Sequence, residues 1–130
     1  MDTAELHAMM AEYMDKGFLE NIKDMLKHDP SLFSALPAMI SDERIGTRIG
    51  VVALAEDMRQ EYPEEFRALI PAIAAHLGNG NPTIRGDAVF LLSAIAHPDA
   101  LPFLESHKDE HPAVRQMVED TIEELKGTDG

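Results

Sequence analysis

The sequence predicts an all-α fold, arranged as a right-handed α-α superhelix, or solenoid, of about four antiparallel helical hairpins. Three observations lead to this prediction. Apolar residues recur at intervals of three and four along nearly the whole chain, as they do on one face of a helix. Five of the eight prolines stand where such a periodic stretch begins. A set made of a proline, an Asp or Asn, and an arginine recurs three times in register. No stretch shows the alternation of a strand.

The prolines define the helix boundaries. Proline suits the first helical position because its missing N–H would have no partner there. Five prolines have this place: Pro30, Pro63, Pro82, Pro98 and Pro112. Asp29 and Asn81, each directly before one of them, are good caps. We therefore expect eight helices joined by short connections, at residues 2–15, 18–28, 30–40, 43–60, 63–77, 82–96, 98–107 and 111–126.

The other three prolines lie within the first helix of a hairpin, in similar apolar surroundings: Pro37, Pro71 and Pro102. A proline in a helix interior costs about 3 kcal/mol in isolation. Three prolines in corresponding places therefore indicate a shared bend. Pro102 is the nearest of the three to a helix start, where a proline costs little.

A second signal recurs in phase with these prolines. Three arginines open the second helices: Arg48, Arg85 and Arg115. Six residues before each stands a short acceptor: Asp42, Asn79 and Asp109. These acceptors can bond to turn or helix N–H groups and can face the arginines, so we expect structural pairs rather than an anion-binding row. The apolar positions that follow also correspond: Val51, Ala88 and Val118; Leu54, Leu91 and Thr121; Met58, Ile95 and Leu125. Arginines 37 and 30 residues apart are typical of a solenoid.

This set resembles the HEAT repeat family, whose units are antiparallel helix pairs with a proline in the first helix, an Asp in the turn and an Arg in the second. The segments 81–85 and 111–115 look most like the short bacterial HEAT-like subtype, and phycobilin lyases carry similar repeats. Asn79 departs from the usual Asp of the family. The resemblance implies a scaffold or a lyase-type subunit and does not separate the two.

The chain is expected to form one domain, residues 1–126. Residues 30–126 hold about three repeats. Residues 1–28 lack the recurring set and are expected to form an irregular N-terminal cap. Residues 127–130 are expected to be a frayed tail.

Composition restricts the partners. The formal charge is −13, from 24 acidic and 11 basic side chains, so we expect neither nucleic acid nor an anionic membrane as a partner. There is no cysteine, and no apolar run approaches the ~20 residues of a membrane span. The N-terminus has no basic and apolar signal pattern, so a cytoplasmic location is expected.

No catalytic or metal constellation stands out, and the chain is expected to be no enzyme and to need no cofactor or metal. His7, Met10 and Met14 share a helix face and could hold a soft metal, but we interpret the methionines as core and His7 as rim. His107 and His111 flank a helix break and are interpreted as loop residues. HEAT-like di-iron enzymes use His-Glu pairs, and no such pair occurs.

The expected function is non-catalytic binding of a protein partner with a basic patch, on the face built from the second helices. The positions off the core of these helices are Arg48, Ile49, Glu56, Gly86, Asp87, Phe90, Ser93, Gln116, Asp120 and Glu123. We place the partner on four of them: Asp87, Phe90, Gln116 and Asp120. Phe90 either anchors the partner or packs between layers, and packing is preferred. The alternative function is an accessory or chaperone-like lyase subunit that handles a small-molecule cofactor. A pocket lined by Phe90 beside Asp87 would favour that alternative, and a broad shallow groove would favour the protein partner.

Overall fold

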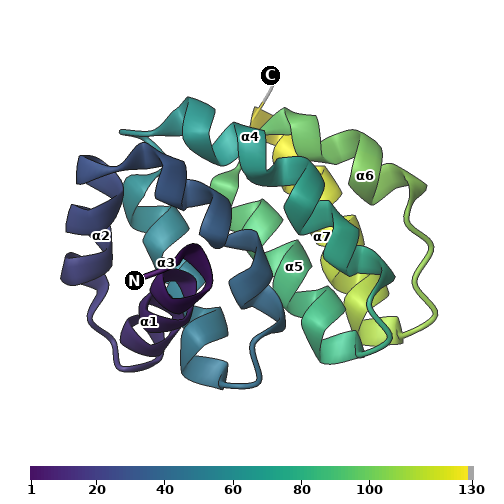
Figure 1. The fold of residues 1–130 in the computed structure, drawn as a ribbon. Coiled ribbons are helices and arrows are strands. Elements are labelled where there is room, and N and C mark those ends of the chain that lie inside the picture. The colour runs from purple at the N-terminus through teal and green to yellow at the C-terminus, as the bar shows by residue number, and fades with distance from the viewer. Residues whose placement is uncertain (129–130) are drawn as a thin grey trace.

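The structure, a computed structural model, describes residues 1–128, and within that span every regular element is a helix and none is a strand (Figure 1). The α-helices are α1 (Thr3–Asp15), α2 (Leu19–His28), α3 (Ile45–Met58), α4 (Pro63–Ala74), α5 (Pro82–Ile95), α6 (Leu101–Ser106) and α7 (Pro112–Thr128). The 3-10 helices are η1 (Pro30–Ala35), η2 (Pro37–Ser41), η3 (Ala75–Gly78) and η4 (Pro98–Ala100). All eight expected segments are helical, which confirms the all-α prediction. No helix in this span combines the length and apolar character that a membrane crossing requires.

The local signals at the helix starts are confirmed. Each of the five expected prolines is the first residue of a helix. The Asp29 carboxylate accepts from the Ser31 N–H at 3.1 Å, and the Asn81 side chain accepts from the Thr83 N–H at 2.9 Å. At the other end of the chain α7 runs to Thr128, beyond the expected end at residue 126. Residues 129–130 of the expected tail lie outside the described residues.

Residues 30–41 form two 3-10 helices instead of one α-helix. Pro37 has no N–H to give to the carbonyl of Phe33, so the α-helical pattern cannot run through this point. The Leu36 N–H donates to that carbonyl instead, at 3.0 Å, in the tighter 3-10 pattern. The helix expected to bend at Pro37 is therefore interrupted there, between η1 and η2. Pro71 lies inside α4 as expected, whereas Pro102 occupies the first turn of α6.

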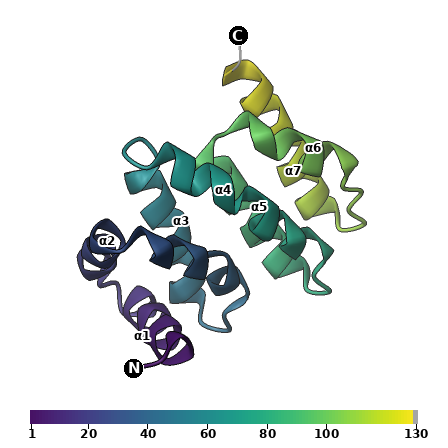
Figure 2. The same ribbon diagram turned by 45° about the horizontal axis from the view of Figure 1, so that its top comes forward.

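The helices lie in two rows with the core between them (Figure 1, Figure 2). The second row contains α1, α3, α5 and α7, each packed on the next. The first row contains α2, η1, η2, α4, η4 and α6. The first hairpin is reversed relative to the others, because α1 packs on α3 in the second row and α2 packs on η1 in the first. Two small residues of α3 allow α1 to pack closely: Gly50, which has no Cβ, lies against Met14, and the buried Thr47 hydroxyl donates to the Ala11 carbonyl at 3.1 Å.

The corresponding apolar positions of the three second helices are all buried. The nine residues are Val51, Leu54, Met58, Ala88, Leu91, Ile95, Val118, Thr121 and Leu125. The same three steps along α3, α5 and α7 therefore face the same core. This burial is what the phase read from the arginines predicts.

The prediction that each arginine pairs with the acceptor side chain six residues before it is wrong, because the side chains of Arg48 and Arg85 bond to carboxylates that lie further along the chain. Arg48 Nε donates to Asp87 Oδ2 at 2.8 Å, and Arg85 Nε and Nη2 donate to the two Asp109 oxygens at 2.8 and 3.1 Å. Arg115 is exposed and forms no ion pair among the described residues. Two of the three arginines therefore join α3 to α5, and α5 to the loop before α7.

The spacing of six residues has a different physical basis from the expected one. Arg48 Nη1 donates to the Asp42 backbone carbonyl at 2.7 Å, and Arg85 Nη1 donates to that of Asn79 at 2.9 Å. The acceptor side chains form turns, which is the first of the two roles expected of them. Each takes the N–H two residues on: Asp42 from Arg44 at 2.9 Å, Asn79 from Asn81 at 2.8 Å, and Asp109 from His111 at 2.9 Å.

Candidate functional site

The four residues predicted to bind a partner all lie in the second row, two on α5 and two on α7. Phe90 is 58% exposed, so the preferred reading, that it packs between layers, is wrong. Gln116 and Asp120 are exposed and bond to each other over one turn of α7, Nε2 to Oδ1, at 2.8 Å. No hydrogen bond or ion pair of the described residues joins the α5 pair to the α7 pair.

Asp87 and Phe90 belong to a groove between α3 and α5, called here the α3–α5 groove. Its volume is about 310 Å³. Its lining residues are Arg48, Ile49, Val52, Ala53, Glu56, Asp87 and Phe90. Ile49 is 60% exposed and, with Phe90, places two large apolar side chains at the surface of the groove. Single exposed apolar residues are common on proteins, and here two of them border the same hollow.

Both ends of the groove are clamped. At one end Arg48 bonds to Asp87, so α3 is tied to α5 at the start of both helices. At the other end Arg59 Nη1 donates to the Ala94 carbonyl at 2.8 Å. These two bonds join the helices that form the walls of the groove.

The charges around the groove are unevenly paired. Asp87 faces Arg48, whose side chain is only 12% exposed, so this carboxylate is already neutralised. Glu56 lines the groove, is exposed, and forms no ion pair among the described residues. Its neighbour Asp57 bonds to Lys23 of α2 at 2.9 Å. The groove therefore presents one unpaired negative charge, at the end of α3.

The candidate metal residues are dispersed. Met10 and Met14 are core residues, as interpreted, and His7 is half-buried. His107 Nε2 lies 2.8 Å from Asp109 Oδ2, where it belongs to the contact between α5 and the loop before α7. Within residues 1–128, no group of three or more His, Asp or Glu side chains has an arrangement that could hold a metal ion.

Two of the seven groove residues, Asp87 and Phe90, are among the four predicted to bind a partner; three more were placed off the core, and Val52 and Ala53 were missed. Val52 and Ala53 are half-buried, and both line the groove. A usable signal was present, because they follow Ile49 by three and four residues and must lie on the same helix face. Gly86, which was placed off the core, is buried against α7.

Comparison of the chain with protein-family models, curated proteins and solved structures finds no match. The geometry of the α3–α5 groove and the repeat pattern therefore carry the functional interpretation.

Proposed function

We propose that the protein is a HEAT-like repeat module, a right-handed solenoid that binds a partner protein in the α3–α5 groove and performs no chemical step. Three features support the solenoid: the ordered packing of α1, α3, α5 and α7, the burial of corresponding residues, and the arginines that tie successive units. In an array of this kind each unit contacts its neighbours, and one row of helices is left to bind a partner.

One observation carries the proposed function: a clamped groove bordered by the exposed side chains of Ile49 and Phe90. Aromatic side chains in such positions are the usual anchors of protein interfaces. The groove is open along two helix turns of α3, from Arg48 to Glu56. A surface of this length suits a pair of apolar side chains from one partner helix or strand.

The partner is proposed to be basic near the groove. The chain carries a net charge of −13, and Glu56 supplies an unpaired carboxylate at the groove. A basic partner would be drawn to this field, while nucleic acid and anionic membranes would be repelled. A cytoplasmic location belongs to the same proposal and is supported by the lack of cysteine.

The test first captures the partner and then measures its affinity. A photoreactive phenylalanine analogue in place of Phe90 is used to cross-link the partner in cells. The purified partner is then titrated against the wild type, Phe90→Ala and Ile49→Ala. Each variant should bind about tenfold or more weakly, because each removes an apolar anchor. Phe18→Ala is the matched control, since Phe18 is 48% exposed and does not line the groove. The proposal fails if the identified partner binds both groove variants as tightly as the wild type.

A second candidate function is favoured by the same cavity. A volume of about 310 Å³ is at the lower end of small-molecule sites, and Phe90 and Asp87 line it together. This is the pocket expected of an accessory or lyase-type subunit that handles a small molecule. Native mass spectrometry of the protein purified from its source distinguishes the two functions. A bound small molecule that Phe90→Ala abolishes supports the second candidate.

A further inference from the structure

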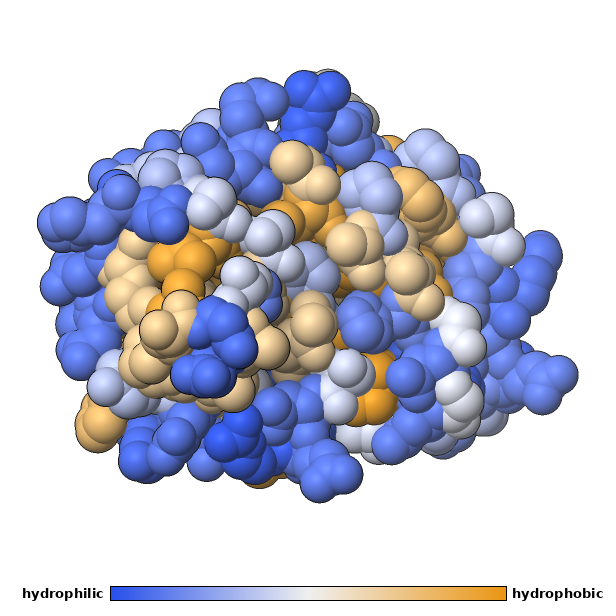
Figure 3. Space-filling model, in the orientation of Figure 1, coloured by the Kyte–Doolittle hydropathy of each residue, from blue (hydrophilic) through white to orange (hydrophobic). Residues whose placement is uncertain are grey.

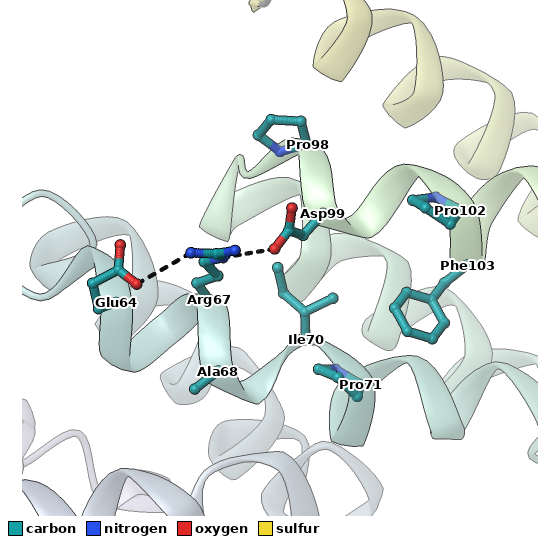
Figure 4. Close-up of a pocket in the computed structure, with 9 residues that line it drawn as sticks. All are labelled: Glu64, Arg67, Ala68, Ile70, Pro71, Pro98, Asp99, Pro102 and Phe103. Atoms are coloured by element: carbon teal, nitrogen blue, oxygen red, sulfur yellow. Dashed lines mark hydrogen bonds and ion pairs between the residues drawn. The ribbon is translucent and has the colours of Figure 1, made fainter.

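A second hollow lies on the first row, between α4 and the segment η4–α6 (Figure 4). It is called here the proline-walled cavity, has a volume of about 500 Å³, and shares no residue with the α3–α5 groove. Its lining residues are Glu64, Arg67, Ala68, Ile70, Pro71, Pro98, Asp99, Pro102 and Phe103. On the face shown in Figure 3, apolar residues gather in two places, one where Figure 1 places α1 and the other where it places α4.

The apolar part of this cavity is rigid. Pro71 on α4 and Pro102 on α6 lie on opposite sides of the Phe103 ring, which points from α6 towards Pro71, and Ile70 lies between Pro71 and Asp99 (Figure 4). Proline rings have fixed backbone angles and offer no N–H. Phe103 is 38% exposed, so part of its ring is available to a ligand. This part of the cavity suits a bulky apolar group.

The polar part of the cavity has more acceptors than donors. Arg67 lies between two carboxylates, with Nε bonded to Asp99 at 2.6 Å and Nη1 to Glu64 at 3.4 Å (Figure 4). One guanidinium and two carboxylates leave one net negative charge. The cavity therefore lacks a donor or a cation.

The charges exclude an anionic occupant and favour a cationic one. The Asp99 side chain is 47% exposed and that of Glu64 is 77% exposed, so a ligand can reach both. An acidic ligand would meet two carboxylates, and the single arginine is already engaged by both of them. A cationic ligand would meet the same two carboxylates: the second oxygen of Glu64 has no partner among the described residues, and that of Asp99 lies 3.6 Å from His97 Nδ1. The rest of the chain, at a net charge of −13, acts in the same direction.

We propose that the proline-walled cavity is a second docking site, and that it takes a segment of a partner protein with a Lys or Arg beside a bulky apolar side chain. The apolar side chain packs on Phe103, Pro71 and Pro102, and the cation pairs with Glu64 and Asp99. Because the cavity lies on the first row, it can be filled while the α3–α5 groove is occupied. The module then joins two partners at once.

The test uses two blocked peptides that differ at one position, acetyl-Gly-Leu-Arg-Gly-amide and acetyl-Gly-Leu-Glu-Gly-amide. Each is titrated at low salt into the 15N-labelled full chain, and amide chemical shifts are followed. The Arg peptide should shift the amides of Arg67, Asp99 and Phe103, and bind at least about tenfold more tightly than the Glu peptide. Equal binding of the two peptides, or shifts confined to α3 and α5, overturns the proposal.

Variants of the protein test both halves of the cavity. Phe103→Ala should weaken the Arg peptide about tenfold. Glu64 is exposed, so Glu64→Gln should not disturb the fold; it should weaken binding of the Arg peptide about threefold and reduce the dependence of this binding on salt. Phe18→Ala is the matched control, because Phe18 is an exposed aromatic residue outside the cavity; this variant should bind the Arg peptide like the wild type. If Phe103→Ala and Glu64→Gln both bind the Arg peptide like the wild type, the proposal is wrong.

The same amide chemical shifts distinguish two other possible occupants of the cavity, a small-molecule cation and a second copy of this chain. Phenethylammonium is an apolar cation without a peptide backbone. If it binds as tightly as the Arg peptide, the cavity is a small-molecule site and the peptide proposal is overturned. If the shifts appear on raising the protein concentration alone, and Phe103→Ala abolishes them, the occupant is a second copy of this chain and the proposal is again overturned.

Discussion

The contact between Asp109 and Arg85 yields the sharpest stability prediction. The Asp109 side chain is 1% exposed, and its oxygens accept from Arg85 Nε at 2.8 Å, Arg85 Nη2 at 3.1 Å and the His111 N–H at 2.9 Å. Asp109→Asn keeps the shape of the side chain and removes its charge, and it also replaces one of the two acceptor oxygens by an NH2 group that cannot accept from Arg85. Loss of one partner of a buried ion pair costs about 3–5 kcal/mol. Since the Arg85 side chain is 16% exposed, the lower value of about 3 kcal/mol applies.

This free energy corresponds to a large fall in the melting temperature. A chain of 130 residues has an unfolding entropy of about 0.27 kcal/mol/K, so about 3 kcal/mol lowers Tm by roughly 11 °C. Circular dichroism at 222 nm during heating measures this fall. Asp42→Asn is the matched control, because Asp42 occupies the same place in its repeat but pairs with Arg44, whose side chain is 41% exposed. That change should lower Tm by less than about 4 °C.

The effect should depend on pH in a defined direction. The Arg85 guanidinium holds the pKa of the Asp109 carboxyl well below its ordinary range, with smaller contributions in the same direction from His107 and the His111 N–H. A folded-state pKa below the unfolded value stabilises the fold above about pH 4, and this stability is lost as the pH falls further. The gap in Tm between wild type and Asp109→Asn should therefore narrow from pH 7 to pH 3. If Asp109→Asn melts within 3 °C of the wild type at pH 7, or Asp42→Asn falls as far, the forward pair between units is not a main support of the fold.

Two further predictions concern single backbone positions. Gly50→Ala should lower the free energy of unfolding by about 1–2 kcal/mol and speed amide exchange in α1, because a Cβ at this point would overlap the Met14 side chain. The control Gly78→Ala, where nothing lies within 4 Å, should change it by less than about 0.5 kcal/mol. Equal melting of both variants would contradict the close packing of α1 on α3. Ala96→Gly should raise Tm by about 2–4 °C in calorimetry, since Ala96 caps the end of α5 at φ 56° and glycine adopts this left-handed conformation without strain. A fall in Tm would show that the contacts of the alanine methyl group outweigh the backbone strain.

The helices could be predicted because their signals are local. A proline at a first helical position and an Asp29 or Asn81 cap act within one turn, so the chain sequence contains the whole interaction. The break at Pro37 lies at the limit of this reasoning. Its missing N–H is readable from sequence, but whether the helix bends around it or changes to 3-10 pitch depends on packing. Pro71 in α4 keeps an α-helix, and Pro37 does not.

The arginine partners could not be predicted because sequence spacing is the same for both alternatives. Arg85 can bond to an acceptor six residues back or to one in the following unit, and only the packing of α5 against α7 decides. The structure uses both, the Asn79 backbone carbonyl behind and the Asp109 side chain ahead. Every residue has a backbone carbonyl, so the presence of Asn at position 79 could not have indicated that the arginine would bond to the backbone there.

The predicted site was divided for a similar reason. The repeat phase placed α5 and α7 residues on one surface, but the helices come close at Gly86, where Met117 fills the space beside the missing side chain. No groove lined by Phe90 opens on that side. Between α3 and α5 the wall residues Val52 and Ala53 are small enough to leave a hollow, so Phe90 borders α3 instead.

The pairing of Arg48 with Asp87 changes what a partner can recognise in the proposed groove. A carboxylate bound by a nearly buried guanidinium contributes little attraction to an incoming cation, because any new pair must compete with an existing bond of 2.8 Å. Recognition in the groove therefore rests on the apolar side chains of Ile49 and Phe90, with Glu56 as the unpaired charge. The proline-walled cavity has the opposite balance, since its two carboxylates share one exposed arginine. Salt should consequently weaken a ligand of the cavity more than a ligand of the groove, and the two proposed surfaces can be told apart by ionic strength alone.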